Sequence, residues 1–188
     1  MERPTAEELR AELARTERGW HSRRAMRHTI FTLVVVAAFA VLITTLATPV
    51  FRVYGDSMSP TLQNESIVVA VRKGRFQRGD VVAFYHHNQI MIKRVIALSG
   101  EWIDLDDAGV VSVNGEALKE TYLEDVSRGD CSTQLPCQVP ENHVFVMGDH
   151  RSVSMDSRSE VIGCVSEEEI IGKLLFCVWP WSDLGFIR

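Results

Sequence analysis

Ser57 and Lys93 are the two residues whose types and surroundings most directly predict chemistry. Ser57 lies in the segment Tyr54–Leu62, where a Gly-Asp pair indicates a turn and a following proline prevents a regular helix from continuing. Lys93 lies further along the chain in the apolar, strand-like segment Met91–Ile96. A serine hydroxyl and a neutral lysine amine can act as nucleophile and base in a hydrolase without any histidine.

The residues around Lys93 could provide the environment that a lysine base needs. In a strand, Lys93 shares one face with Gln89, Met91 and Val95, so it has little polar company. At an unperturbed pKa of ~10.4, only about one lysine in a thousand is neutral near pH 7.4. Burial against apolar side chains can lower the pKa by several units. The alternative is a lysine that extends over an apolar face to reach water.

A third polar segment, Gly148–Arg158, directly follows an apolar strand-like stretch. It contains two aspartates, two arginines and three serines. Such a density of charges and hydroxyls predicts a rigid, hydrogen-bonded support for a site. The alternative is an ordinary polar surface loop.

One long apolar run, Thr29–Phe51, predicts a membrane anchor. It has no charged residue over roughly 23 positions, which is enough for a helix to cross a ~30 Å hydrocarbon core. Between Arg18 and His28 the chain has four arginines and no acid, so the positive-inside rule predicts a cytoplasmic N-terminus and an extracytoplasmic remainder. A cleavable signal peptide is the rival interpretation, but its apolar stretch should be shorter.

The pattern therefore predicts three parts: a cytoplasmic arm at 1–28, a transmembrane anchor at 29–51 and a catalytic domain at 52–188. The arm should be helical from Glu7 to Arg27, where Ala, Leu, Glu and Arg are abundant. Beyond the anchor, short apolar runs separated by turn residues predict a mostly antiparallel β domain. The expected strands are 66–71, 80–85, 89–98, 102–105, 110–113, 144–147 and 170–179, with a hairpin turn at Asn114-Gly115. Gly115–Pro140 is the least patterned stretch and is expected to be a surface excursion.

Charge and cysteine content narrow the classes of partner. The net charge of −5 opposes nucleic-acid binding. The four cysteines do not form a zinc motif, and neither a metal nor a cofactor is predicted. Cys131 and Cys137 are either a disulfide or two thiols, since they bracket a short loop. The aromatic C-terminal stretch from Phe176 either closes the core or rests on a lipid surface.

Taken in chain order, these segments resemble the bacterial type I signal peptidases. The resemblance covers nearly the whole chain. It rests on the N-terminal anchor, Ser57–Leu62, Arg78–Val82, Lys93–Ala97 with Gly100-Glu101, and Gly148–Arg158.

The resemblance implies that Ser57 is the nucleophile and Lys93 the general base of a serine endopeptidase that removes signal peptides. It implies that Ser154 hydrogen-bonds and orients the lysine, while Asp156 and Arg158 form a structural ion pair. Gly148, Asp149 and Arg151 would then shape the loop, and Met58 is an apolar neighbour of the nucleophile. The implied partners are secretory pre-proteins and membrane lipid, in a single-pass protein of the cell membrane. The oligomeric state is not predicted.

Two positions depart from the family pattern. Gly55 stands where some members carry a serine that stabilises the oxyanion, and such a glycine resembles the Gram-positive branch. This leaves the backbone N–H of Ser57 as one oxyanion donor and the second donor unidentified. His150 stands where the family usually has asparagine, and no catalytic role is assigned to it.

Two other functions compete with this one. A self-cleaving Ser/Lys protease of the SOS-repressor kind would have a similar β core, but it should be a soluble chain, which the run at Thr29–Phe51 opposes. A membrane-anchored β module could instead bind exported proteins without catalysis, and the residues at Gly55 and His150 leave room for that function.

Overall fold

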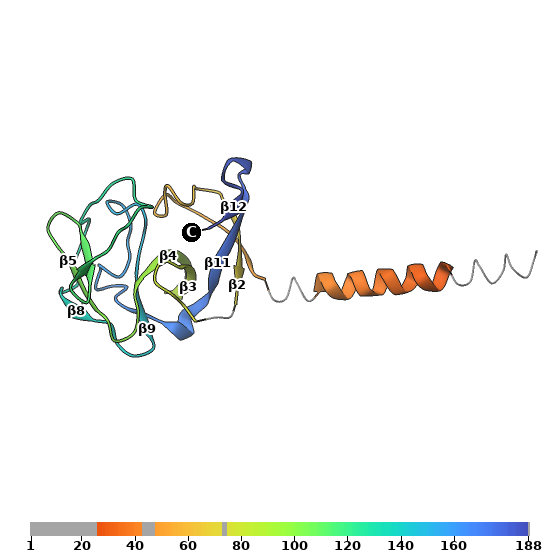
Figure 1. The fold of residues 1–188 in the computed structure, drawn as a ribbon, viewed down its shortest axis with the longest axis horizontal. Coiled ribbons are helices and arrows are strands. Elements are labelled where there is room, and N and C mark those ends of the chain that lie inside the picture. Colours follow the sequence, from red (N-terminus) through yellow and green to blue (C-terminus); the bar gives the residue numbers. More distant parts are fainter. Residues whose placement is uncertain (1–25, 43–47, 73–74, 188) are drawn as a thin grey trace, which may run out of the picture. The chain divides into compact units, whose positions relative to one another are not determined.

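The computed structural model describes residues 26–42, 48–72 and 75–187 (Figure 1). The chain divides into two units, Met1–Leu46 and Ala47–Arg188, of which the second contains the β-strands. In the first unit, residues 26–42 are helical. The helix predicted for the arm lies outside the described residues, apart from its last two positions.

The predicted anchor is described only in part. Residues 29–42 are helical, whereas 43–47 lie outside the described residues. In the part of the chain that is described, no helix is both long enough and apolar enough to cross a membrane. The predicted end of the anchor at Phe51 is wrong, because Val50–Arg52 form strand β1 and pair with β2 (Ile67–Val71). Phe51 packs against the core of the β unit, so its apolar side chain belongs to the folded domain.

The β unit has two sheets in which every strand pair is antiparallel, so the prediction of a mostly antiparallel β fold is confirmed. The larger sheet runs β1, β2, β11 (Ile170–Trp179), β3 (Val81–His86), β4 (Gln89–Ala97), β9 (His143–Met147) and β10 (Val165–Ser166), with β12 (Gly185–Phe186) paired to β11. The smaller sheet runs β7 (Glu116–Ala117), β6 (Val111–Val113), β5 (Trp102–Leu105) and β8 (Cys137–Gln138). Two 3-10 turns, η1 (Glu167–Glu169) and η2 (Trp181–Asp183), flank β11.

Hydrophobic periodicity explains the strands that the sequence predicted. The first four residues of β3 are all buried, as expected for a strand covered on both faces, whereas β5 alternates exposed and buried residues. The Asn114-Gly115 turn joins β6 to β7 with positive φ at both residues, which the hairpin prediction required. The strands that were missed (β1, β7, β8, β10 and β12) have two or three residues, too few for a period to show.

The pairing of β4 positions the two segments that carry polar chemistry. Strand β4 pairs with β3 from Gln89 to Arg94, but its pairing with β9 begins only at Arg94, opposite Met147. Within the described chain, residues 89–93 therefore keep one unpaired backbone edge. Because β9 ends at Met147, the loop 148–158 leaves the sheet directly beside Lys93 and Arg94.

The cysteines and the C-terminal aromatic residues end up in different surroundings. All four cysteines are free thiols, and Cys177 is buried in the core. The aromatic residues at the end of β11 and beyond do not close the core, since Trp181 is 74% exposed and Phe186 is 77% exposed. Phe186 contacts Phe176 edge to face, with 5.2 Å between ring centroids.

Candidate active site

A tight turn anchored in the core carries Ser57. Gly55 has a φ of +87°, which suits glycine, and its N–H donates to Asn64 Oδ1 at 2.9 Å. Two further backbone hydrogen bonds close the turn, from Ser59 N–H to the Asp56 carbonyl (3.0 Å) and from Leu62 N–H to the Met58 carbonyl (2.9 Å). Met58 and Leu62 are buried in the core cluster, so their side chains fix the turn to the hydrophobic core.

Lys93 reaches this turn from strand β4. Its Nζ lies 2.6 Å from Ser57 Oγ, and the residue is 3% exposed. Burial lowers the pKa of Lys93 from 10.5 to about 8; Asp156 raises this pKa, Arg158 lowers it and Asp149 raises it. At a pKa of about 8, roughly one lysine in five is neutral near pH 7.4, compared with about one in a thousand for an exposed lysine. The environment thus makes an amine base available at neutral pH.

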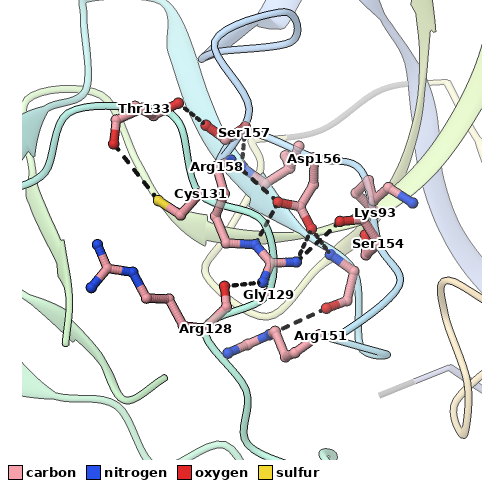
Figure 2. Close-up of polar contacts among 12 residues, drawn as sticks. Lys93, Arg128, Gly129, Cys131, Thr133, Arg151, Ser154, Asp156, Ser157 and Arg158 are labelled. Carbon is pink, nitrogen blue, oxygen red and sulfur yellow. Dashed lines mark hydrogen bonds and ion pairs between the residues drawn. The ribbon is translucent and has the colours of Figure 1, made fainter. Parts of the chain in front are cut away.

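The loop 148–158 provides a buried ion pair behind the lysine (Figure 2). Arg158 binds Asp156 through two hydrogen bonds, from Nε to Oδ1 at 2.8 Å and from Nη2 to Oδ2 at 2.9 Å, and neither side chain is exposed. Asp156 Oδ2 also accepts from the backbone N–H of Gly148 at 2.9 Å. Because every charge in this pair has a partner, the loop can be rigid at a low local dielectric.

A second buried ion pair was not predicted from the sequence. Arg94 donates from Nε to Asp149 Oδ1 at 2.8 Å and from Nη2 to Asp149 Oδ2 at 2.6 Å. Asp149 Oδ2 also accepts from the hydroxyl of Thr61, which belongs to the turn that carries Ser57. The pair therefore fastens the loop to the nucleophile turn. A signal for it was present, since Arg94 stands between Ile92 and Ile96 on a strand face that would otherwise be apolar.

Gly148 allows the loop to approach the nucleophile turn closely. A Cβ at this position would lie 2.5 Å from the Ser57 carbonyl oxygen and 2.1 Å from Ser154 Oγ. Two residues further along, His150 donates its backbone N–H to the same Ser57 carbonyl at 3.1 Å. The loop thus holds the backbone of the nucleophile directly.

The hydrogen bond expected between Ser154 and Lys93 is absent from the structure. Ser154 is buried, and its Oγ has no partner among the described residues because it faces the Cα of Gly148. His150 Nδ1 is likewise buried without a partner among these residues.

A cavity of about 710 Å³ opens beside Ser57 and Lys93. Residues 50–54, 57–58 and 89–93 line it. Its two long walls are β1 with the residues after it and the first half of β4. Among the described residues, no three His, Cys, Asp or Glu side chains gather into a group that could hold a metal ion.

Comparisons with known proteins identify the family to which this chain belongs. The sequence profile of the family "Signal peptidase, peptidase S26" matches residues 26–179. Signal peptidase I S of Bacillus subtilis (strain 168) is 32% identical over 164 residues, which cover 81% of this chain and 88% of the relative. Signal peptidase IB of Staphylococcus aureus (strain MRSA252) is 32% identical over 161 residues, which cover 75% and 82%. A solved signal peptidase I from Enterococcus faecalis V583 is 30% identical with a TM-score of 0.45, over 54% of this chain and 97% of that one.

The family match and the two curated relatives define a serine endopeptidase of bacterial type. The chain belongs to the signal peptidase family, peptidase S26, and the resemblance to the bacterial type I enzymes is confirmed.

Substituting Gly148→Ala should impair both peptidase activity and stability. The added Cβ must displace the Ser57 carbonyl, since a backbone atom cannot swing away as a side-chain tip can. We expect kcat/KM to fall by roughly a hundredfold, with a loss of about 1–3 kcal/mol in the free energy of unfolding. The matched control is Gly185→Ala, because a Cβ there meets no atom within 4 Å. Equal activity in the two variants would contradict the positioning role of Gly148.

Lys93→Met should stabilise the folded chain at neutral pH. The unfolded chain keeps its Lys93 proton up to the ordinary pKa of 10.5, whereas the folded chain releases it near 8. The free energy of unfolding therefore rises with pH between these two values, and below about pH 8 the folded state bears the full cost of a desolvated ammonium.

Denaturant unfolding of Lys93→Met at pH 7 should show a gain of about 1–3 kcal/mol and a smaller rise in stability between pH 8 and 10.5. Lys119→Met, at an exposed position, serves as the control and should change neither quantity. A methionine variant that is less stable at pH 7 than the parent would show that Lys93 is not held desolvated.

Proposed function

We propose that this protein is a membrane-anchored serine endopeptidase that removes signal peptides from secreted pre-proteins, with Ser57 and Lys93 as its catalytic pair. The observation that carries the proposal is the 2.6 Å contact between Lys93 Nζ and Ser57 Oγ at the wall of a cavity large enough for an extended peptide. Membership of the signal peptidase family supports the choice of substrate.

The chemistry follows from the pair. Neutral Lys93 accepts the proton of Ser57 Oγ as that oxygen attacks the scissile carbonyl carbon. The resulting ammonium gives the proton to the leaving amine nitrogen, which frees the mature protein and leaves the signal peptide as an ester on Ser57. Lys93, neutral again, then takes a proton from water, whose oxygen attacks the ester carbonyl. As the ester bond breaks, the Lys93 ammonium returns this proton to Ser57 Oγ, which restores the serine hydroxyl and the neutral amine and releases the signal peptide as a carboxylic acid. Asp156 and Arg158 form the fixed charge environment in which the lysine gains and loses its proton.

The oxyanion of each tetrahedral intermediate needs hydrogen-bond donors. The backbone N–H of Ser57 has no acceptor among the described residues, so it is available as one donor. Gly55 provides no side-chain donor, and the second donor is not assigned.

An extended substrate fits the backbone edges around the cavity. Strand β1 pairs with β2 on one side only, and residues 89–93 of β4 have an unpaired edge within the described chain. A signal peptide could add to either edge by β-augmentation and bring its scissile bond to Ser57. The half-buried side chains Met91 and Ile92, together with Met58, favour small apolar residues next to the cut.

The run Thr29–Phe51, with its cationic flank, supports a cell-membrane location with the N-terminus in the cytoplasm and the domain from residue 52 outside. We propose that the helical residues 26–42 belong to this anchor, which therefore ends before β1. Exposed Trp181 and Phe186 support lipid as a second partner, since tryptophan is favoured at membrane interfaces. An enzyme anchored in the same membrane as its substrate encounters that substrate at a higher effective concentration.

The two competing functions make different predictions. A self-cleaving protease should cut its own chain and stay in the soluble fraction, whereas the proposed enzyme should fractionate with membranes and cut a second chain. A non-catalytic module should bind pre-protein and release it uncut.

Ser57→Ala and Lys93→Ala should each abolish cleavage of a purified pre-protein by the full-length chain in detergent, because nucleophile and base act as one unit. The product with the mature N-terminus, detected by mass spectrometry, is the readout. Ser59→Ala is the matched control, a serine in the same turn whose hydroxyl makes no hydrogen bond among the described residues, and it should retain activity. Cleavage by a folded Lys93→Ala protein would refute the proposed pair.

A further inference from the structure

The segment between β7 and β8 contacts all three buried arginines around the active site. We call residues 118–129 the cover segment. Tyr122 lies against Arg94, Glu120 binds Arg151, and Arg128 accepts a hydrogen bond from Arg158. The sequence predicted only a surface excursion here, so these contacts are a finding of the structure.

Tyr122 covers the Arg94–Asp149 pair. The guanidinium carbon of Arg94 lies 4.0 Å from the centroid of the Tyr122 ring, a close cation–π contact. The Tyr122 hydroxyl donates to Glu120 Oε1 at 2.5 Å. Burial and the bond to Glu120 raise the pKa of Tyr122 above its usual range, so the hydroxyl stays protonated as a donor.

Glu120 neutralises the third arginine. Arg151 Nη2 donates to Glu120 Oε1 at 2.5 Å, and the Glu120 side chain is only 8% exposed. Arg151 Nε donates to the Gly148 carbonyl at 3.2 Å, so Glu120 acts on the same glycine that contacts the Ser57 carbonyl. Loss of Glu120 would leave a buried guanidinium without its carboxylate.

Backbone fit holds the end of the cover segment to the loop 148–158 (Figure 2). Arg158 Nη1 donates to the Arg128 carbonyl at 2.7 Å. Gly129 has a φ of +57°, and a Cβ there would lie 2.4 Å from the Arg151 carbonyl oxygen and 2.6 Å from Arg158 Nη1. The cover segment therefore contacts the loop 148–158 near its own start, through Glu120, and at its own end, through Arg128 and Gly129.

We propose that Glu120 and Tyr122 are positioning residues that hold the buried arginines and thereby fix Ser57 and Lys93 relative to each other. The route through Tyr122 runs from Arg94 to Asp149 and from Asp149 to Thr61 in the nucleophile turn. The route through Glu120 runs from Arg151 to Gly148. The kinetic consequences rest on the proposed function, whereas the effect on Lys93 itself does not.

The charges that act on Lys93 give the proposal a specific signature. These are Asp156, Arg158 and Asp149. Without the Tyr122 ring, Arg94 becomes more mobile and more hydrated, so it neutralises Asp149 less. A less neutralised carboxylate stabilises the ammonium form of Lys93, so the pKa of Lys93 rises and less neutral base is available.

The test compares Tyr122→Leu, Tyr122→Phe and Glu120→Gln with the control Thr121→Ala, an exposed neighbour in the same segment. Full-length variants in detergent are assayed with a pre-protein after circular dichroism has verified folding. For Tyr122→Leu we expect kcat to fall by roughly three- to tenfold at nearly constant KM, with the acidic limb of the pH profile moved to higher pH. Tyr122→Phe, which keeps the ring, should recover most of kcat and remains informative if the leucine variant does not fold. Glu120→Gln should lower kcat without a rise in KM.

A second readout needs no substrate. The rate at which acetic anhydride acetylates Lys93, followed against pH by peptide mass spectrometry, reports the neutral fraction of its amine. In Tyr122→Leu this curve should move to higher pH, while Thr121→Ala should match the parent.

If Tyr122→Leu moves the acetylation curve to higher pH relative to the parent, but the parent cleaves no pre-protein, the positioning role is supported and the proposed function is refuted. Folded Tyr122→Leu and Glu120→Gln variants that match Thr121→Ala in kcat and in the acetylation curve would overturn the positioning role. So would a rise in KM with an unchanged acetylation curve, since it would indicate contact with substrate instead.

Discussion

The structure depends on one costly arrangement, a lysine amine kept out of water and in contact with a serine hydroxyl. Burial is the main reason that the pKa of Lys93 falls to about 8, and the nearby carboxylates work against it. An amine can stay in such a position only if its surroundings are too well packed to let it reach solvent. The strand β4, buried from Lys93 to Ala97, and the turn fixed by Met58 and Leu62 provide that packing. The burial that destabilises the folded chain is therefore the same burial that makes neutral Lys93 available as a base.

Buried charges around this pair act as a rigid frame. Arg94 with Asp149 joins the loop 148–158 to the nucleophile turn, and Arg158 with Asp156 fixes the loop internally. Such pairs contribute little net stability, but the loss of one partner is strongly destabilising, so they hold geometry more than they hold the fold. The cover segment extends this frame to a third arginine through Glu120. The active site is thereby supported by chain segments distant in sequence.

The sequence was sufficient where local periodicity or a family motif carried the information. Longer strands such as β3, β4 and β11 follow from their apolar patterns, and the closeness of Ser57 to Lys93 followed from the resemblance. Contacts that depend on tertiary packing could not be predicted, because no local pattern reveals that Tyr122 faces Arg94. For the same reason the sequence did not show that Ser154 Oγ faces Gly148 instead of Lys93, or that Phe51 belongs to a strand that packs on the core.

The most direct test of the account is an NMR titration of Lys93 in the full-length chain in detergent, with its side-chain signal assigned by comparison with Lys93→Arg. The account predicts a midpoint near pH 8, well below the ordinary lysine value of 10.5. A midpoint close to 10.5 would show that the amine is solvated and protonated at neutral pH, and Lys93 could then not serve as the base.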